Sequence, residues 1–147
     1  MESKTQRLKI KAILNNSSNE ILFVKDTESD PTQTLRLPEQ MILYGETPEF
    51  GLRRAILEMA NIEAEPLSLL GIYSKMELDA ANTRHVITIV FICLILDFGK
   101  VADRSNCIWL NKFEQTKMPI IEEDKRILRD YAAWRIDKST YWTTKLF

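Results

Sequence analysis

Residues 37–62 read LPEQMILYGETPEFGLRRAILEMANI and contain the clearest helix start in the chain. Thr47 can cap the free amide groups of the first turn, and Pro48 is tolerated there because the first turn does not need its missing N–H. Glu49 suits the positive end of a helix dipole. Apolar residues then recur at helical spacing, at Leu52, Ile56 and Ala60. The stretch therefore predicts a helix that begins at residue 47 or 48, ends near residue 60 and buries one face.

Strands are expected on both sides of this helix. Residues 8–14 and 21–26 are rich in aliphatic side chains, and the turn cluster NNSSNE between them predicts a β-hairpin. Further extended segments are expected at 35–38, 41–44, 68–75 and 107–110. Residues 85–96, HVITIVFICLIL, are apolar on both faces and predict a central strand. With a last helix from about residue 122 to residue 137, the order indicates an α+β sandwich rather than a doubly wound sheet.

Composition limits the classes of protein that this chain can belong to. Its 147 residues fit one domain, 1–147, and 45% apolar content excludes a disordered chain. The net charge of −1 gives no general attraction to phosphate backbones, so we expect no nucleic-acid partner. The longest apolar run, residues 86–96, is about half of what a membrane span needs, so we expect no membrane partner. Two cysteines are too few for a disulfide framework, which favours a soluble, cytoplasmic protein.

One side of the predicted helix has part of the chemistry of a cation site. At about 100° per residue, this side carries Arg54, Ala55, Glu58 and Met59, and we expect it to face a cleft. A magnesium site that acts on phosphates needs several carboxylate oxygens on one rigid surface, and an arginine can orient one of them. A methyl group and a thioether bind no hard cation. The side therefore has the arginine and one glutamate, but two positions offer no oxygen.

The spacing of this stretch resembles the Nudix box, G-x5-E-x7-R-E-U-x-E-E-x-G-U, in which U is a bulky aliphatic residue. Aligned without gaps over residues 40–62, the resemblance keeps the first glutamate, the arginine, an aliphatic residue, one glutamate of the pair and the final aliphatic residue: Glu46, Arg54, Ile56, Glu58 and Ile62. It departs from the box at the first glycine, the glutamate after the arginine, the second glutamate of the pair and the late glycine: Gln40, Ala55, Met59 and Asn61. Leu37-Pro38 precedes the box, as is usual, but the glycine pair that usually follows is Glu39-Gln40 here.

The resemblance covers about residues 7–136 and implies a Nudix-type α/β/α sandwich with a mixed central sheet. Residues 71–95, GIYSKMELDAANTRHVITIVFICLI, are similar to the stretch that follows the box in ADP-ribose pyrophosphatases. The loop before the last helix lies where those enzymes often keep an acidic residue that helps to activate water. The candidates for that role are Glu122, Glu123 and Asp124.

The resemblance implies a hydrolase of nucleoside diphosphate derivatives such as ADP-ribose. In this reading, Glu46 and Glu58 are ligands of magnesium or manganese, Arg54 orients a carboxylate, Glu122 or Glu123 is the base and Arg84 contacts a substrate phosphate. Because two carboxylate positions are replaced, we expect the activity to be weak or lost. A non-catalytic nucleotide-binding or sensing module is the alternative, and an interaction scaffold is a third reading.

Simpler readings stay open for the same residues. Arg54 and Glu58 are four apart and can form an ordinary helix-surface pair, while Glu46 can serve the helix start. Ala55 and Met59 can form an apolar patch against which another element packs. Arg84 can be a solvated surface residue, the acids at 122–124 can complement the helix dipole, and His85 reads as structural. The aromatic tail, residues 137–147, either packs on the core or forms a homodimer contact.

Overall fold

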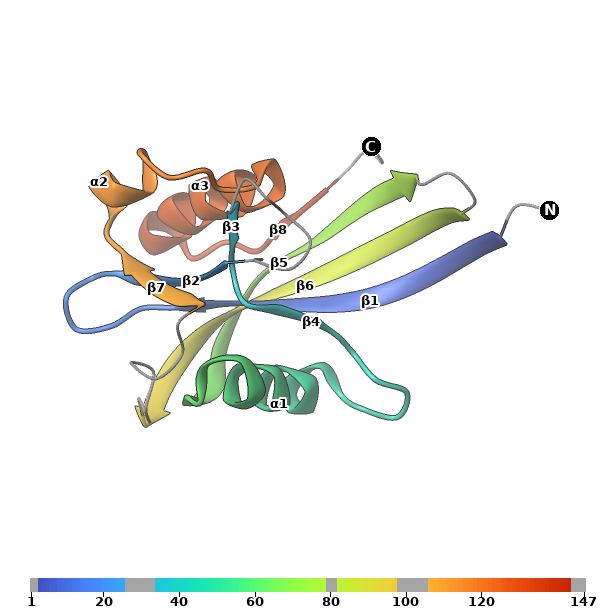
Figure 1. Cartoon of the computed structure of the whole chain (residues 1–147), viewed down its shortest axis with the longest axis horizontal. Helices are drawn as coiled ribbons and strands as arrows, with labels where there is room; N and C mark the ends of the chain where they lie inside the picture. The colour runs from blue at the N-terminus through green and yellow to red at the C-terminus, as the bar shows by residue number, and fades with distance from the viewer. Residues whose placement is uncertain (1–2, 26–33, 79–81, 98–105, 144–147) are drawn as a thin grey trace.

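The computed structural model describes residues 3–25, 34–78, 82–97 and 106–143 (Figure 1). Its helices are α1 (Pro48–Ala60), α2 (Lys112–Gln115) and α3 (Glu122–Asp137). Its strands are β1 (Ser3–Leu14), β2 (Ile21–Lys25), β3 (Leu35–Arg36), β4 (Glu39–Met41), β5 (Glu63–Leu78), β6 (Asn82–Asp97), β7 (Cys107–Leu110) and β8 (Tyr141–Trp142). Within the described residues, no helix is both long enough and apolar enough to cross a membrane.

The main sheet is mixed and has the strand order β4-β1-β6-β5-β8. β6 runs parallel to β1 along twelve residue pairs and antiparallel to β5 on its other side. The prediction of a central strand at 85–96 is therefore confirmed, because β6 has a neighbour on both edges. The α+β class with a mixed central sheet is confirmed as well.

The predicted hairpin of residues 8–14 and 21–26 is wrong. Both segments are strands, but β2 belongs to a second sheet with the order β3-β2-β7. Between β1 and β2 only Asn15 and Ile21 form an isolated bridge. The turn between the two segments is present, as predicted. However, β1 pairs with β4 and β6, and β2 pairs with β3 and β7. Pairing over long sequence distances decided the outcome, and a local turn pattern does not contain that information.

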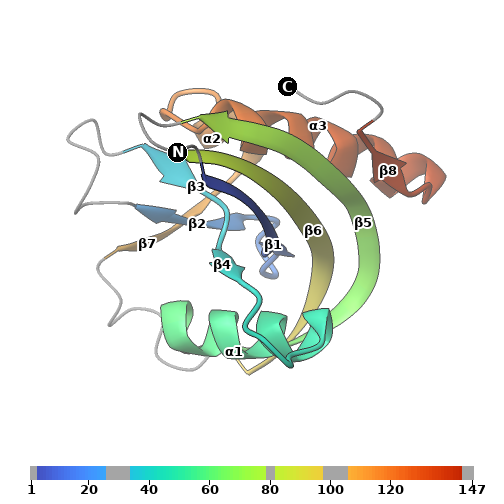
Figure 2. The same cartoon turned by 90° about the vertical axis from the view of Figure 1, so that its right-hand side faces the viewer.

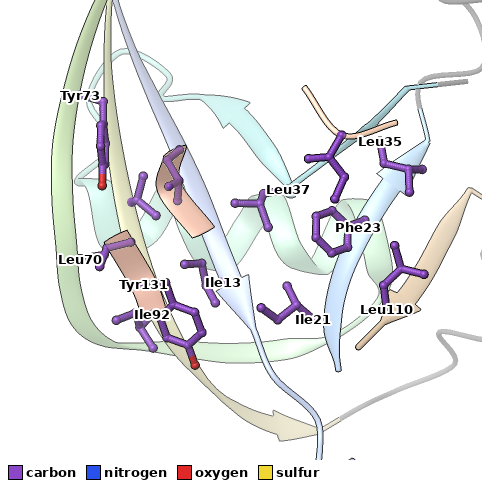
Figure 3. Close-up of a cluster of buried hydrophobic side chains, with 13 residues drawn as sticks. Ile13, Ile21, Phe23, Leu35, Leu37, Leu70, Tyr73, Ile92, Leu110 and Tyr131 are labelled. Carbon is purple, nitrogen blue, oxygen red and sulfur yellow. The ribbon is translucent and has the colours of Figure 1, made fainter. Parts of the chain in front are cut away.

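Two cores lie on opposite sides of the main sheet. Figure 2 shows α1 on one side of the curved β5–β6 pair and α3 on the other. The core on the α1 side contains Leu52, Ile56 and Ala60, as their spacing predicted. The core on the α3 side gathers side chains from both sheets around Phe23 and Tyr131 (Figure 3).

β1 contributes to both sides because its side chains alternate. Ile10 and Ala12 belong to the core on the α1 side. Lys9 and Lys11 therefore point to the α3 side, and both are buried there. This places two cations inside the molecule next to the first turn of α3.

The C-terminal segment contains a short strand, β8, that was not predicted from the sequence. β8 pairs in parallel with β5, with Gly71 opposite Tyr141. A Cβ atom at Gly71 would lie 2.4 Å from the carbonyl oxygen of Tyr141, so only glycine permits this approach. Trp142 remains 65% exposed, and Phe147 lies outside the described residues. The tail therefore docks on the sheet in part, and the homodimer stays a prediction.

Candidate functional site

The turn and caps around α1 give the Nudix-like stretch its shape. Gly45 has a φ of 86°, a conformation that favours glycine, just before the helix. Thr47 caps the helix by accepting a hydrogen bond from the amide of Phe50, as predicted. Asn61 ends the helix in the left-handed conformation, with a φ of 55°. Because asparagine tolerates this conformation better than most residues, Asn61 keeps the backbone of the glycine that the box usually has here.

Arg54 and Glu46 form a two-pronged ion pair. The guanidinium of Arg54 donates to Glu46 from Nε at 2.7 Å and from Nη2 at 3.0 Å, and Nη2 also donates to the carbonyl oxygen of Met41. The amide of Leu43 donates to the same carboxylate at 2.8 Å. These donors lower the pKa of Glu46, the hydrogen bonds from Arg54 most and that from Leu43 next. Both oxygens of Glu46 therefore already accept hydrogen bonds, Oε2 from Arg54 and Oε1 from Arg54 and Leu43.

Glu58 lies near the same arginine but on the surface. Its carboxylate accepts a hydrogen bond from Nη1 of Arg54 at 3.3 Å, and 57% of its side chain is exposed. Arg54 thus links the two glutamates that were predicted as metal ligands. The orienting role predicted for Arg54 has a geometric basis, and so has the simpler reading of a helix-surface pair.

The expectation that the helix side with Arg54, Ala55, Glu58 and Met59 faces a cleft is wrong at Ala55. Ala55 is 3% exposed and belongs to the same core as Leu52 and Ile56. Met59 is half-buried, and its carbonyl oxygen accepts a hydrogen bond from the thiol of Cys107. The helix turns this flank toward the second sheet, so the reading of an apolar patch describes Ala55 better than an emptied ligand position does.

A second group of charges lies on the α3 side, and we call it the charged cluster: Lys9, Lys11, Lys75, Glu39, Glu123 and Asp124. Lys11 is fully buried, and its ammonium contacts Asp124, Glu39 at 3.2 Å and Glu123 at 3.8 Å. Lys9 lies 3.0 Å from Glu39, and Lys75 lies 3.1 Å from Glu123. Three ammonium groups thus meet three carboxylates, and the charges balance within the cluster.

Asp124 also connects this cluster to the residues before the box. Its second carboxylate oxygen accepts a hydrogen bond from the amide of Leu37 at 2.6 Å. Glu39, which stands where the family usually has glycine, pairs in β4 with Lys11 of β1. The replaced glycine position therefore carries the carboxylate that neutralises two buried lysines. Asp124 is 0% exposed, so it serves this connection rather than a reaction with solvent.

Burial and charge act against each other on the pKa values of the cluster. Burial favours the neutral form of Glu39, but Lys11 and Lys9 outweigh it and lower the pKa to about 2. Burial likewise opposes ionisation of Glu123, and Lys11, Lys9 and Lys75 together lower its pKa. Burial raises the pKa of Asp124, against the attraction of Lys11. Burial alone would lower the pKa of Lys11, but Asp124 and the two glutamates raise it.

A cavity of about 530 Å³ opens beside the cluster and contains some of the predicted site residues. It is lined by residues of β1, β3, β4, β5 and the start of α3: Lys9, Arg36, Glu39, Gln40, Met41, Lys75, Glu77, Ile121, Glu122 and Glu123. The predicted bases Glu122 and Glu123 thus reach it. Arg54, Glu46 and Glu58 do not line it, and no hydrogen bond or ion pair within the described segments joins them to Glu122 or Glu123.

Arg84 and His85 lie elsewhere, on β6. Arg84 stands opposite Thr5 of β1 and Glu77 of β5, and it does not line the cavity beside the charged cluster. Its predicted contact with a substrate phosphate stays a prediction. His85 contacts the amide group of Gln6 at 3.3 Å, which agrees with the structural reading of this histidine.

The described residues fit a multi-ion magnesium site poorly. In the part of the chain that the structure describes, no three His, Cys, Asp or Glu side chains are arranged to hold a metal ion. The carboxylates of the charged cluster converge on lysine ammonium groups, and those of Glu46 and Glu58 converge on Arg54. Each acidic group thus already contacts a cation of the chain itself.

The lysines are what sequence reasoning missed. The alternation in LKIKAIL, 8–14, placed Lys9 and Lys11 on one face of the strand, and that signal was available. Two lysines on a strand ordinarily indicate a solvated face. Only the arrival of Glu39, Glu123 and Asp124 from distant elements makes that face an interior one.

Comparison with known proteins agrees with this geometry. No family model matches the chain. A curated ADP-ribose pyrophosphatase of Methanocaldococcus jannaschii is 30% identical over 118 residues, which span 80% of this chain and 68% of that protein. Among solved structures, a Nudix hydrolase from Nitrosomonas europaea superposes with a TM-score of 0.69 at 18% identity, over 95% of this chain and 99% of the other. An ADP-ribose pyrophosphatase from Streptococcus suis gives 0.61 at 13% identity, over 96% and 98%.

The mixed sheet between two helices, with a box-like loop and helix on one side, defines the class of Nudix hydrolases. The chain belongs to this family, and within it resembles the ADP-ribose pyrophosphatases. Nudix hydrolases act on nucleoside diphosphate substrates and generally use divalent metals such as magnesium.

Proposed function

We propose that this protein acts on nucleoside diphosphate derivatives such as ADP-ribose, with weak or lost hydrolysis. The substrate class is supported by the similarity to the pyrophosphatase of Methanocaldococcus jannaschii, which extends over most of both chains. The loss of activity is supported by a single observation. Every carboxylate predicted for the chemistry is held by an arginine or lysine of the chain or exposed on the surface.

The box helix supports this proposal first. With Ala55 in the core and Met59 half-buried, Glu58 is the one box glutamate on the helix that faces solvent. Glu46 has to release Arg54 and Leu43 before it can bind a cation. Any magnesium or manganese ion would therefore depend on Glu58 and on a rearranged Glu46. The loss of one electrostatic group commonly costs about a hundred- to a thousand-fold in rate.

The proposed base supports it second. A general base works best when its pKa lies near the operating pH. Three lysines lower the pKa of Glu123, which leaves it ionised but makes it a weaker proton acceptor. Glu122 is 86% exposed and pairs with Lys125, so nothing fixes it toward a reacting water.

The alternative is a nucleotide-binding or sensing module without catalysis. It is favoured by the charged cluster, because Lys9 and Lys75 line the cavity of about 530 Å³ and can attract a phosphate without a metal ion. The polar lining of this cavity suits a ribose or a phosphate rather than an apolar ligand.

Titration calorimetry with ADP-ribose, with and without magnesium, tests the proposal, together with an assay of the two phosphate monoesters, AMP and ribose 5-phosphate, that hydrolysis of the diphosphate forms. Metal-dependent binding with slow turnover supports the weak hydrolase, and binding that is indifferent to metal supports the sensing module. Glu58→Gln is expected to abolish the slow turnover, while Glu49→Gln, an exposed change on the same helix, preserves it. Turnover at the rate of an ordinary enzyme, or no binding of any nucleotide, contradicts the proposal.

A further inference from the structure

A second cavity lies along α3, away from the candidate site. Its volume is about 700 Å³, within the range of small-molecule sites. Its walls come from α3, from the segment 112–120 around α2, and from the turn between β1 and β2. Figure 1 shows these three parts at one end of the molecule. The cavity shares no lining residue with the cavity beside the charged cluster.

Part of the wall of this cavity is apolar and comes from the core on the α3 side. The apolar lining residues are Ile21, Met118, Ile120, Leu128, Tyr131 and Ala132. Ile21, Ile120 and Tyr131 are core residues with less than a tenth of their surface exposed, so they form a rigid floor of the cavity. A ligand with an aliphatic or aromatic body would remove the remaining apolar surface from water.

Four cationic side chains also line this cavity, and one of them has an acidic partner just outside it. Lys112, Lys125, Arg129 and Arg135 line the cavity, and none of its described lining residues is an aspartate or a glutamate. Lys125 forms an ion pair with the exposed Glu122, 3.0 Å away. The guanidinium of Arg135 lies 5.9 Å from the centre of the Tyr131 ring. Within the described residues, no ion pair involves Lys112 or Arg129. Cations around an apolar cavity floor are complementary to an anion with an apolar body.

Two polar side chains near the floor of the cavity add hydrogen-bonding capacity. The side-chain amide of Asn15 donates to the hydroxyl of Tyr131 at 2.6 Å, and both residues line the cavity. The side-chain oxygen of Asn15 is buried and has no hydrogen-bond partner. A buried acceptor without a partner is rare in folded proteins and calls for a donor. A water molecule held between Asn15 and a bound ligand would supply it.

We propose that this cavity binds a small organic anion, a carboxylate or phosphate monoester with an apolar body. The apolar body rests on Leu128 and Tyr131, and the anionic group reaches Arg129 and Lys112. The site is separate from the cavity of the nucleotide chemistry proposed above, because no described residue lines both cavities, and the exposed pair of Lys125 and Glu122 lies between them.

Calorimetry with octanoate and octyl phosphate, against octanol and octylammonium, tests this chemistry. Both anions are expected to bind with one site per chain and to weaken as salt rises, while the neutral and cationic analogues do not bind. The stronger of the two anions identifies the preferred head group. Equal binding of octanol and octanoate overturns the proposal, because it would reflect apolar contact alone.

Matched variants locate the site. Arg129→Ala is expected to weaken octanoate about tenfold, through the loss of one charge-assisted contact. Lys4→Ala, an exposed cation at the far end of β1, serves as the control. Ala132→Trp fills the cavity from α3 and should abolish binding, whereas Ile136→Trp, on the same helix outside the cavity, should not. Binding that is the same in all four variants overturns the proposal, and ADP-ribose titrations of each variant show whether the candidate site is intact.

Discussion

Lys11 has a buried ammonium group that three carboxylates surround. Removing one member of a buried ion pair leaves an uncompensated charge and typically costs about 3–5 kcal/mol. Lys11→Met is therefore expected to reduce the free energy of unfolding by that amount, measured by denaturation in urea. Lys4→Met, on the exposed part of the same strand, is the control and should change it little. Equal stability of both variants would mean that Asp124 takes up a proton at little cost.

Glu39 predicts how stability depends on pH. Its pKa is about 2 in the folded protein and 4.5 in a free glutamate. Because the folded pKa is the lower one, its contribution is present above pH 4.5 and is lost as the pH falls from about 4.5 to about 2. The shift corresponds to at most about 3 kcal/mol.

Glu39→Gln should flatten the acid limb of a plot of unfolding free energy against pH. Glu49→Gln, an exposed change at the start of α1, should leave that limb as it is. A wild-type slope in the Glu39 variant would mean that other carboxylates, not this one, carry the acid sensitivity.

At the scale of elements, α1 ends where it does because Asn61 adopts the left-handed conformation. Glycine adopts this conformation without strain, whereas a β-branched residue does not. Asn61→Gly is expected to keep the melting temperature or to raise it slightly, and Asn61→Val to lower the stability by about 1–2 kcal/mol. Thermal unfolding followed by circular dichroism measures both. A tolerated valine would show that the helix end can move.

The long strands illustrate how far an element follows from its own residues. The apolar run at 85–96 identified β6, and the cap and spacing at 47–60 identified α1. The hairpin failed because strand partners are chosen by distant segments, and β8 was missed because two residues carry no periodic signal. Among the predicted site residues, Glu46, Arg54 and Glu58 lie together along α1 and the loop before it. Glu122 and Glu123 line the cavity on the α3 side instead.

For the whole molecule, the balance of charges predicts a weak response to magnesium. An ion that binds only the folded state adds about 0.4 kcal/mol when its concentration equals its Kd. Since the acids of the candidate site already contact arginine or lysine, millimolar magnesium should leave the thermal midpoint nearly unchanged, and so should EDTA. Differential scanning calorimetry provides the measurement. A rise of several degrees with magnesium would mean that Glu46 and Glu58 release Arg54 and form a real site.

The sequence by itself determined which family this protein resembles and where its main helix and central strand lie. The helix start at Thr47, the spacing from Glu46 to Ile62 and the central strand are local patterns, and local patterns are set by neighbours along the chain. Only the tertiary structure decided what the site contains. In the folded chain, Ala55 lies in the core, and Lys11 lies among carboxylates from β4 and α3. Neither follows from the sequence, because burial and charge pairing depend on segments that meet only in the folded chain.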